Sequence, residues 1–221
     1  TWDRTAKKIE TLRLNGQDLA LSGLYTTFLK PWMPEGEMSK LVWTGRGDVQ
    51  LQMLDGNIDA LNANLRDASV KPESGGFELA GILAALSWSP THARDSQIDV
   101  ARGAIGKLPL GKFQIRASLA PAQISVAPIV LPILDGTLRV DGINAQRTAQ
   151  NWRWSVSAGL QPISMQQLSS ALNLPVMHGT LSAVIPQLSY ENQALSVGGA
   201  LLFKVFDGSI VVKDLSARDL F

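Results

Sequence analysis

The C-terminal part of the chain carries the feature that most constrains its fold. Apolar residues recur at alternate positions on both sides of the dipeptide Asp207-Gly208. An Asp-Gly pair between two such runs is the strongest short-range signal for a β-hairpin, because its tight turn needs positive φ angles that Asp and Gly tolerate. The twelve residues 195–206 predict one long strand, and 209–215 predict the strand that returns beside it. A strand of that length suits a long sheet.

The same kind of turn recurs upstream. Leu54-Asp55-Gly56-Asn57-Ile58, Leu134-Asp135-Gly136-Thr137-Leu138 and Met177-His178-Gly179-Thr180-Leu181 share its order of apolar, turn, small polar and aliphatic residues. Their spacings are uneven, which excludes a solenoid of fixed period. We interpret these sites, and Asn15-Gly16, as hairpin turns, and not as places where the aspartates bind calcium or act in catalysis.

Further alternating segments predict strands along the whole chain. The prolines in 124–134 make that segment an edge or irregular strand, and Gly45 and Gly47 predict a bulge. Asp141-Gly142 is expected to bend the chain. The strands are expected within 9–24 (with a turn at 15–16), 42–54, 61–66, 77–88, 98–105, 113–119, 124–134, 138–141, 152–160 and 180–185.

Helix signals are few. Residues 25–30 read as a helical turn ended by Pro31. The sequence Ser164-Met165-Gln166-Gln167 fits a capping box, in which Ser164 caps the first helical turn and Gln167 reaches back to it. Ile163 and Leu168 are placed as a hydrophobic staple, and Leu174-Pro175 ends the helix.

The expected fold class is therefore mainly β: a long, antiparallel, strongly curved sheet, either a trough or an open sandwich, with one or two short helices, in a single domain over residues 1–221. One face of such a sheet is apolar. It either packs into a filled core or lines a trough that takes an apolar ligand. The residues expected on this lining are Phe113, Ile115, Leu119, Leu138, Val140, Trp154, Val156, Leu181, Ala183, Ile185, Leu195, Val197, Leu201, Phe203, Val205, Ile210 and Val212.

Two tryptophans at two-residue spacing allow a second interpretation. Trp152 and Trp154 share a face with Val156, Ala158 and Leu160. In a line of aliphatic residues this pair is expected in the core. If it is exposed, it could serve as a platform for carbohydrate.

Composition argues against several classes of function. The net charge is +1 without blocks of like charge, which argues against a nucleic-acid partner, and the absence of cysteine excludes disulfides and zinc-thiolate sites. His92 and His178 lie in expected turns without metal-spaced neighbours, and no nucleophile elbow, phosphate loop or zincin motif occurs. We therefore expect no enzyme activity, no metal and no cofactor. The chain begins at Thr1, so we interpret it as a piece of a longer protein with any membrane anchor outside it.

The C-terminal half resembles a known family. The segments 178–186, 195–201 and 205–212 (HGTLSAVIP, LSVGGAL and VFDGSIVV) are similar to the repeated β segments of the AsmA/TamB-like envelope proteins, above all to their YdbH-type branch. The resemblance is sharpest over residues 160–217. It extends to the first half only as a rhythm of strands.

This resemblance implies a periplasmic trough of β-strands in the Gram-negative envelope, with a parent protein anchored in the inner membrane. The expected ligand is the acyl chains of phospholipid, carried between the inner and outer membranes. A partner strand or a small outer-membrane lipoprotein is expected at a sheet edge. Two alternatives stay open: a non-enzymatic β-scaffold that binds partners by strand-edge augmentation, and a carbohydrate-binding β-sandwich.

Overall fold

The structure, a computed structural model, describes residues 2–3, 8–30, 40–148, 151–191, 194–206, 208–213 and 216–218. It confirms the expected fold class: the chain is mainly β, its strands pair antiparallel and bend, and its α-helices are short. The chain divides into two compact units. Unit 1 contains residues 1–106 and 116–121, and unit 2 contains residues 107–115 and 122–221, so that strand β9 (Phe113–Ala120) contributes to both.

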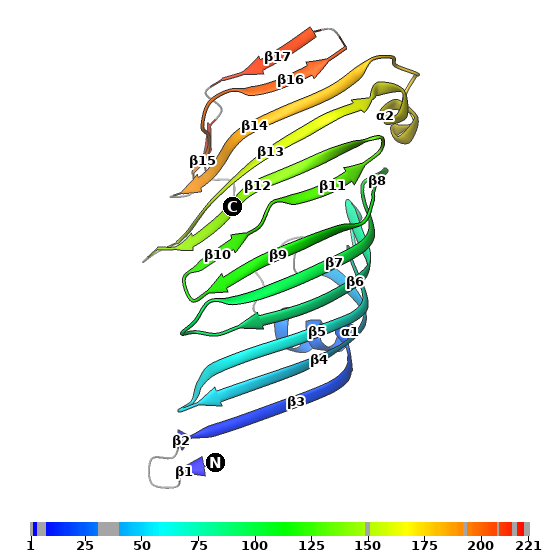
Figure 1. Cartoon of the computed structure of the whole chain (residues 1–221). Coiled ribbons are helices and arrows are strands. Elements are labelled where there is room, and N and C mark those ends of the chain that lie inside the picture. The colour runs from blue at the N-terminus through cyan, green and yellow to red at the C-terminus, as the bar shows by residue number, and fades with distance from the viewer. Residues whose placement is uncertain are drawn as a thin grey trace. The chain divides into compact units, whose positions relative to one another are not determined.

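Unit 1 is built on five long strands that bend along their length (Figure 1). Neighbouring strands in the sheet are neighbours in the sequence, in the order β3 to β7, because hairpins connect them. Their bounds are β3 Thr11–Ala20, β4 Leu41–Leu54, β5 Asn57–Pro72, β6 Phe77–Trp88 and β7 Arg94–Ile105. The short strands β1 (Trp2–Asp3) and β2 (Lys8–Ile9) pair with each other.

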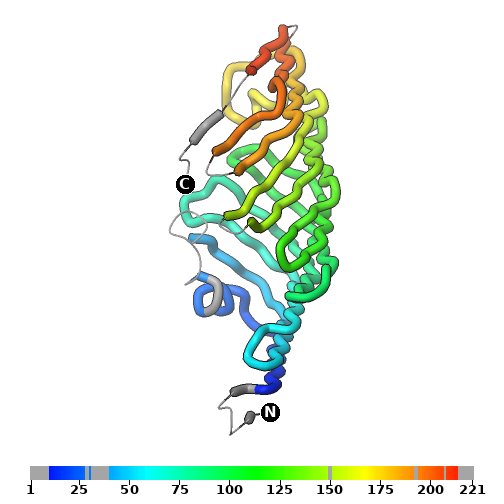
Figure 2. The backbone as a smooth tube through the Cα atoms, turned by 90° about the vertical axis from the view of Figure 1, so that its left-hand side faces the viewer, coloured from blue at the N-terminus to red at the C-terminus, as the bar shows by residue number. Residues whose placement is uncertain are grey.

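The core of unit 1 forms where a short helical segment lies on one side of the sheet (Figure 2). Helix α1 (Leu21–Leu24) continues into a π-helical turn, η1 (Tyr25–Leu29), and Leu21 and Tyr25 are 6% and 4% exposed. The ring of Tyr25 lies 6.4 Å from that of Trp43 on β4. The sheet contributes buried residues from all of β4 to β7: Leu41, Ala68, Val70, Ala80, Ile82, Ala84 and Val100.

Unit 2 is a second run of antiparallel strands with one helix at its margin. In the sheet, β17, β16, β14, β13 and β12 are consecutive neighbours, β10 and β11 pair with β12, and β15 pairs with β14 and β18. The bounds are β8 Leu108–Leu110, β10 Gln123–Val126, β11 Ile129–Ile133, β12 Gly136–Arg147, β13 Trp152–Ser164, α2 Met165–Leu172, β14 Thr180–Glu191, β15 Ala194–Val197, β16 Leu201–Val205, β17 Gly208–Val212 and β18 Ser216–Arg218.

Several local predictions are confirmed. The β4–β5 hairpin turns at Asp55 and Gly56, both with positive φ, and register shifts mark bulges at Gly45 and Gly142. Ser164 caps α2 by accepting a hydrogen bond from the Gln167 N–H at 3.4 Å.

In two further hairpins the turn lies one residue earlier than the Asp-Gly pair predicts. In the β11–β12 hairpin Ile133 pairs with Gly136, so the turn consists of Leu134 and Asp135, with Leu134 at φ 53°. In the β16–β17 hairpin Val205 pairs with Gly208 in the same way, and Phe206 has φ 55°. Asp207 lies outside the described residues.

Three predictions about turns and strand ends are wrong. Residues 195–206 are not one strand: β15 and β16 are separated by Gly198 and Gly199, the latter at φ 107°. His178-Gly179 is no hairpin turn, because it connects α2 to β14. The chain does not turn at Asn15-Gly16: β3 continues through it with a register shift between Gly16 and Leu19.

The expected strand through Leu21 and Leu24 is also wrong, because these residues are helical. The expected helical turn at residues 25–30 is present over Tyr25–Leu29, but it follows α1 directly. Leu21 is buried there, which supplies the tertiary contact that so short a helix needs.

Candidate functional site

The most distinctive feature of unit 2 is a face of its sheet that is apolar from strand to strand. Directly opposed residues of an antiparallel pair share a face. Leu160 lies opposite Leu138 and Ala183, Ala183 opposite Phe203, and Phe203 opposite Ile210. With Leu131 opposite Leu138, this row takes one residue from each of six strands, β11, β12, β13, β14, β16 and β17. At about 4.8 Å between strands, it extends over about 24 Å.

Neighbouring rows are equally apolar, and together they define what we call the apolar face. Two register shifts interrupt the pairing of β13 with β14. They keep Leu188 of β14 and Ile163 of β13 on this face, where simple alternation would place them on the other. The other rows are Ile163, Leu181 and Val205; Ile129, Val140, Ala158 and Ile185; Val156, Leu188 and Val197; Leu201 and Val212; and Ile124, Ala145, Trp154, Tyr190 and Leu195.

The apolar face is for the most part half-buried, and in this it differs from a filled core. Among the described residues of unit 2, the buried apolar ones are Leu110, Phe113, Ile129, Ile133, Ile163 and Met165. Ile163 and Met165 flank Ser164, the N-cap residue of α2, and Leu110 is the partner of Ile133. Away from these residues, most side chains of the apolar face stay partly accessible to solvent.

The predicted lining residues separate into three groups by burial. Phe113 is 7% exposed and belongs to the buried core, and Ile210 on β17 is 55% exposed. The rest are half-buried: Ile115, Leu119, Leu138, Val140, Trp154, Val156, Leu181, Ala183, Ile185, Leu195, Val197, Leu201, Phe203, Val205 and Val212. Leu119 belongs to unit 1, whereas the others lie in unit 2. The paired strands of unit 2 bring those on β12 to β17 onto one face.

Sequence reasoning missed Leu188 and Tyr190 on this face. They follow Pro186, and the register shift beside it moves the apolar positions of β14 from odd to even numbers. In this alternating run the apolar residues change from odd to even positions after the proline. That change is the sequence signal that could have predicted the two residues. Leu131 and Ile129 were also not predicted, because they lie in a segment that was expected to be an edge or irregular strand.

The two tryptophans of β13 are not in a buried core, contrary to the expectation. Trp152 is 41% exposed and Trp154 is half-buried. One side of the Trp154 indole is occupied, because the Tyr190 ring stacks on it with centroids 5.7 Å apart and planes at 15°. The pair Trp152 and Trp154 is therefore not a flat, open platform of two free rings.

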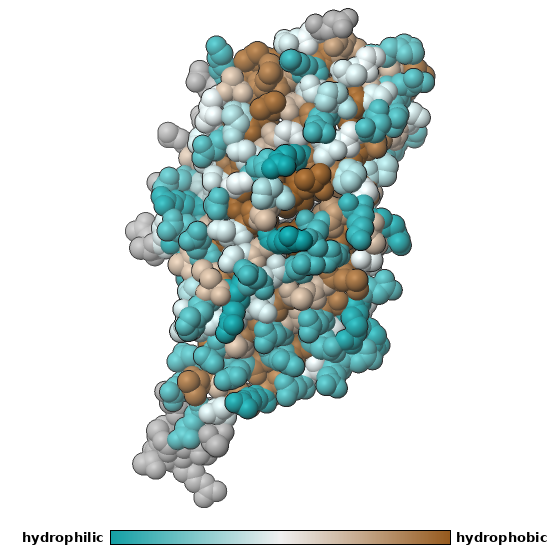
Figure 3. Space-filling model, in the orientation of Figure 1, coloured by the Kyte–Doolittle hydropathy of each residue, from teal (hydrophilic) through white to brown (hydrophobic). Residues whose placement is uncertain are grey.

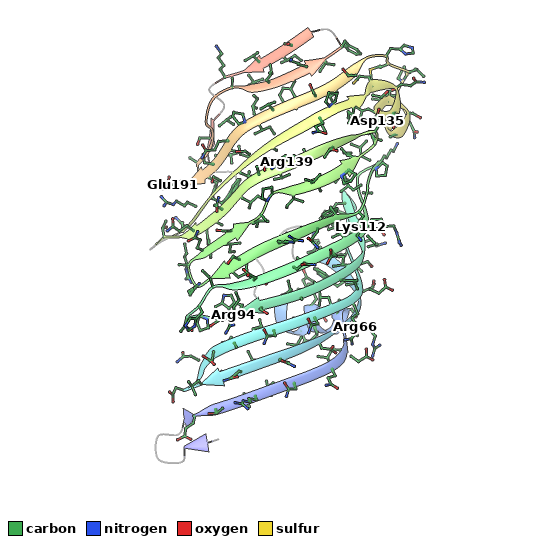
Figure 4. All side chains as sticks on the ribbon, in the orientation of Figure 1. Arg66, Arg94, Lys112, Asp135, Arg139 and Glu191 are labelled. Carbon is green, nitrogen blue, oxygen red and sulfur yellow. The ribbon has the colours of Figure 1, made fainter. Side chains whose placement is uncertain are left out.

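The residues that the pairing places on the other face of unit 2 are mostly polar, among them Arg139, Arg153, Ser155 and Ser182. The surface in Figure 3 is a mixture of hydrophilic and hydrophobic areas. Arg139 and Asp141 form an ion pair of 2.8 Å on the other face, which raises the pKa of Arg139 through a hydrogen bond, and Arg153 lies 3.9 Å from Glu191. Figure 4 shows Arg139 in the middle of β12, with Asp135 and Glu191 at opposite margins of the strands of unit 2. An exception is the apolar row of Val184, Leu202 and Val211.

Unit 1 holds a cluster of charges at the bulge of β3. Arg46 and Arg66 lie opposite each other on β4 and β5. The Arg46 guanidinium donates a hydrogen bond of 2.6 Å to Asp18, and Arg66 donates to Asp48. These hydrogen bonds hold the pKa of Asp18 and the pKa of Asp48 below their usual values, and they raise those of both arginines. Three of the four side chains are exposed and that of Asp48 is half-buried, so solvent screens these ion pairs.

The described residues offer little for chemistry. No group of three or more His, Cys, Asp or Glu side chains that could hold a metal ion is found among them. The Nδ1 atom of His92 lies 2.7 Å from the Thr91 hydroxyl, which accounts for the position of that ring. Within the described ranges, no helix is long and apolar enough to cross a membrane.

The apolar face is thus the feature of unit 2 from which a function can be argued. Comparison of the chain with protein-family models, with curated proteins and with solved structures found no match.

Proposed function

We propose that this chain carries phospholipid acyl chains on the apolar face of unit 2, as a non-enzymatic part of a periplasmic bridge between the inner and outer membranes. The observation that carries the proposal is the continuity of the half-buried apolar rows over six neighbouring strands. A partly exposed apolar surface that continues over several strands is typical of sites that bind apolar ligands or partners. The periplasmic location and the inner-membrane anchor of a parent protein rest on the family resemblance.

The chemistry of the face suits transfer more than tight capture. An acyl chain gains about 0.8 kcal/mol for each CH₂ removed from water, but a bilayer already supplies that free energy. A carrier must therefore offer the acyl chains a free energy similar to that of the bilayer, and it must bind no single lipid strongly. Leu160, Ala183 and Phe203 present only hydrocarbon, and rows of such side chains provide similar contacts at every step along the sheet.

The first test is direct. The chain is purified from a Gram-negative envelope, extracted with organic solvent, and analysed by mass spectrometry beside a control protein handled identically. We expect phospholipid enriched above the control. A chain free of lipid, together with a failure to take up lipid from vesicles, would contradict the proposal.

Adjacent residues of β16 provide a matched pair of variants. Phe203 lies on the apolar face and Leu202 on the opposite face, and both are half-buried. Phe203→Asp should leave the chain folded and reduce lipid uptake at least several-fold, because an ionised carboxylate among hydrocarbon chains is strongly unfavourable. Leu202→Asp should retain uptake. Equal loss in both variants would mean that the effect is on folding and not on the lining.

A second candidate is a scaffold that binds a partner strand or a small lipoprotein at the sheet edge. The observation in its favour is strand β17, which pairs with β16 alone in the described part of the chain and exposes Ile210 and Val211 at 55% and 51%. Unpaired strand edges of this kind accept an added strand. Val211 lies on the face opposite the apolar face, so Val211→Pro should abolish such binding while leaving lipid uptake intact.

A further inference from the structure

One margin of the apolar face differs in chemistry from the rest. Trp152 and Trp154 lie near the beginning of β13, and Tyr190 lies near the end of β14, far along the strands from α2. Indole and phenol rings combine an apolar body with a polar tip, so they favour the boundary between apolar and aqueous surroundings. These three rings therefore mark one rim of the apolar face, where a bound lipid would pass from hydrocarbon to polar groups.

In the part of the chain that the structure describes, one cation accompanies the rings. Arg147 at the end of β12 lies directly opposite Trp152, so its side chain emerges on the same face of the sheet, and it is exposed. Its backbone N–H donates a hydrogen bond of 2.8 Å to the Ala122 carbonyl, which holds this end of β12 in place. No ion pair of its guanidinium is found among the described residues.

The strand pairing of unit 2 sets the position of Arg147 apart from those of the other basic residues on these strands. Arg139 lies opposite Gly159, Arg153 opposite Gln146, and Lys204 opposite Ser182, and all three point to the polar face. Arg139 and Arg153 also have partners there, in Asp141 and Gln146. Along the described parts of β12 to β17, Arg147 is the one Lys or Arg that the pairing places on the apolar face, and no Asp or Glu shares that face with it.

We propose that Arg147, with Trp152, Trp154 and Tyr190, forms a headgroup subsite for glycerophospholipid, in which the guanidinium binds the phosphodiester and the rings border the glycerol region. Arg is suited to this role because its N–H groups match two phosphate oxygens at once and its charge is permanent. The inference rests on the proposed function, since the acyl chains of the same lipid lie on the apolar face beyond the rings.

The subsite can be separated from the face by comparing two lipids with identical acyl chains. Phosphatidylglycerol carries the phosphodiester and diacylglycerol lacks it. Uptake of each from vesicles is measured for the unmodified chain, for Arg147→Gln, and for Arg153→Gln as the matched control on the polar face. We expect Arg147→Gln to lower phosphatidylglycerol uptake about tenfold, to leave diacylglycerol uptake unchanged, and Arg153→Gln to change neither.

Fluorescence quenching locates the lipid independently. Phosphatidylglycerol with bromine atoms close to the glycerol should quench the β13 tryptophans more than the same lipid brominated near the chain ends, and replacing both Trp152 and Trp154 by Phe should remove most of this difference. Uptake of both lipids with no effect of Arg147→Gln and no dependence on bromine position would overturn the subsite and leave the proposed function standing. Uptake of neither lipid would overturn both.

Discussion

The carboxylate of Asp135 accepts a hydrogen bond of 2.9 Å from the backbone N–H of Ser164. Asp135 belongs to the turn between β11 and β12, and Ser164 is the N-cap residue of α2. The two residues are distant in sequence, so the turn aspartate joins a hairpin to the helix beside it. One of the Asp-Gly motifs, which the sequence alone indicates only as a turn, therefore also has a structural role.

Replacing Asp135 by Ala should therefore weaken the attachment of α2. The Ser164 N–H would lose its partner, and we expect a loss of about 1 kcal/mol in the free energy of unfolding, as is typical of one hydrogen bond at a partly exposed site. Chemical denaturation measures it. Asp95→Ala, at an exposed position without a side-chain partner among the described residues, should change stability by less than half of that. Equal effects would contradict the role of Asp135.

Gly136 should not tolerate a side chain. A Cβ atom there would lie 2.5 Å from Cγ2 of Ile163 and 2.8 Å from the carbonyl oxygen of Pro162, closer than van der Waals contact allows. Because Ile163 is buried, relief requires a shift of packed atoms, and Gly136→Ala should cost about 1–3 kcal/mol. Gly23→Ala in α1 meets no atom within 4 Å, and it should be neutral or stabilising by up to about 1 kcal/mol. Thermal unfolding of the two variants gives the comparison.

Acid should loosen the charge cluster of unit 1. The folded-state pKa of Asp18 and of Asp48 lies below the usual value near 3.8, so their contribution to stability is complete above that pH and is lost as the pH falls through the lowered values. Replacing Asp48 by Asn should flatten the dependence of stability on pH below about 4. Unfolding curves recorded from pH 6 to pH 2 would show this, with Asp95→Asn as the control. An unchanged slope for Asp48→Asn would mean that the cluster is not linked to folding.

How much of this fold follows from the sequence depends on whether the signal is local. The β4–β5 turn at Asp55-Gly56 and the cap of α2 at Ser164 were predictable, because the residues that determine each structure are neighbours in the chain. Asn15-Gly16 has the same local signal, yet β3 runs through it, because pairing with β4 on both sides is available and a bulge absorbs the misfit. At this position the long-range pairing of strands outweighs the local preference for a turn.

The same distinction explains the candidate site. Alternation placed Leu181, Ala183 and Phe203 on one face, as their register confirms. It could not place Arg147 or Tyr190, because bulges in β12 and β14 change which parity faces the apolar side. Nor could it tell half-buried residues from buried ones, since burial depends on what covers the face. Leu21 in unit 1 is an example. It lies in a four-residue helix that has no capping signal in the sequence and is stabilised by packing.

Stability measurements can distinguish an open apolar face from a filled core in solution. Ile163 is 2% exposed, whereas Leu160, three residues earlier on the same strand and the same face, is half-buried. Ile163→Ala should cost about 2–5 kcal/mol, because it leaves a cavity in packed surroundings. Leu160→Ala removes a side chain that water already reaches on one side, and about 1 kcal/mol is expected. Denaturant unfolding without lipid measures both, and comparable losses would show that the face is covered and filled. Added phospholipid should stabilise the unmodified chain more than Leu160→Ala, since a ligand stabilises the form to which it binds more tightly.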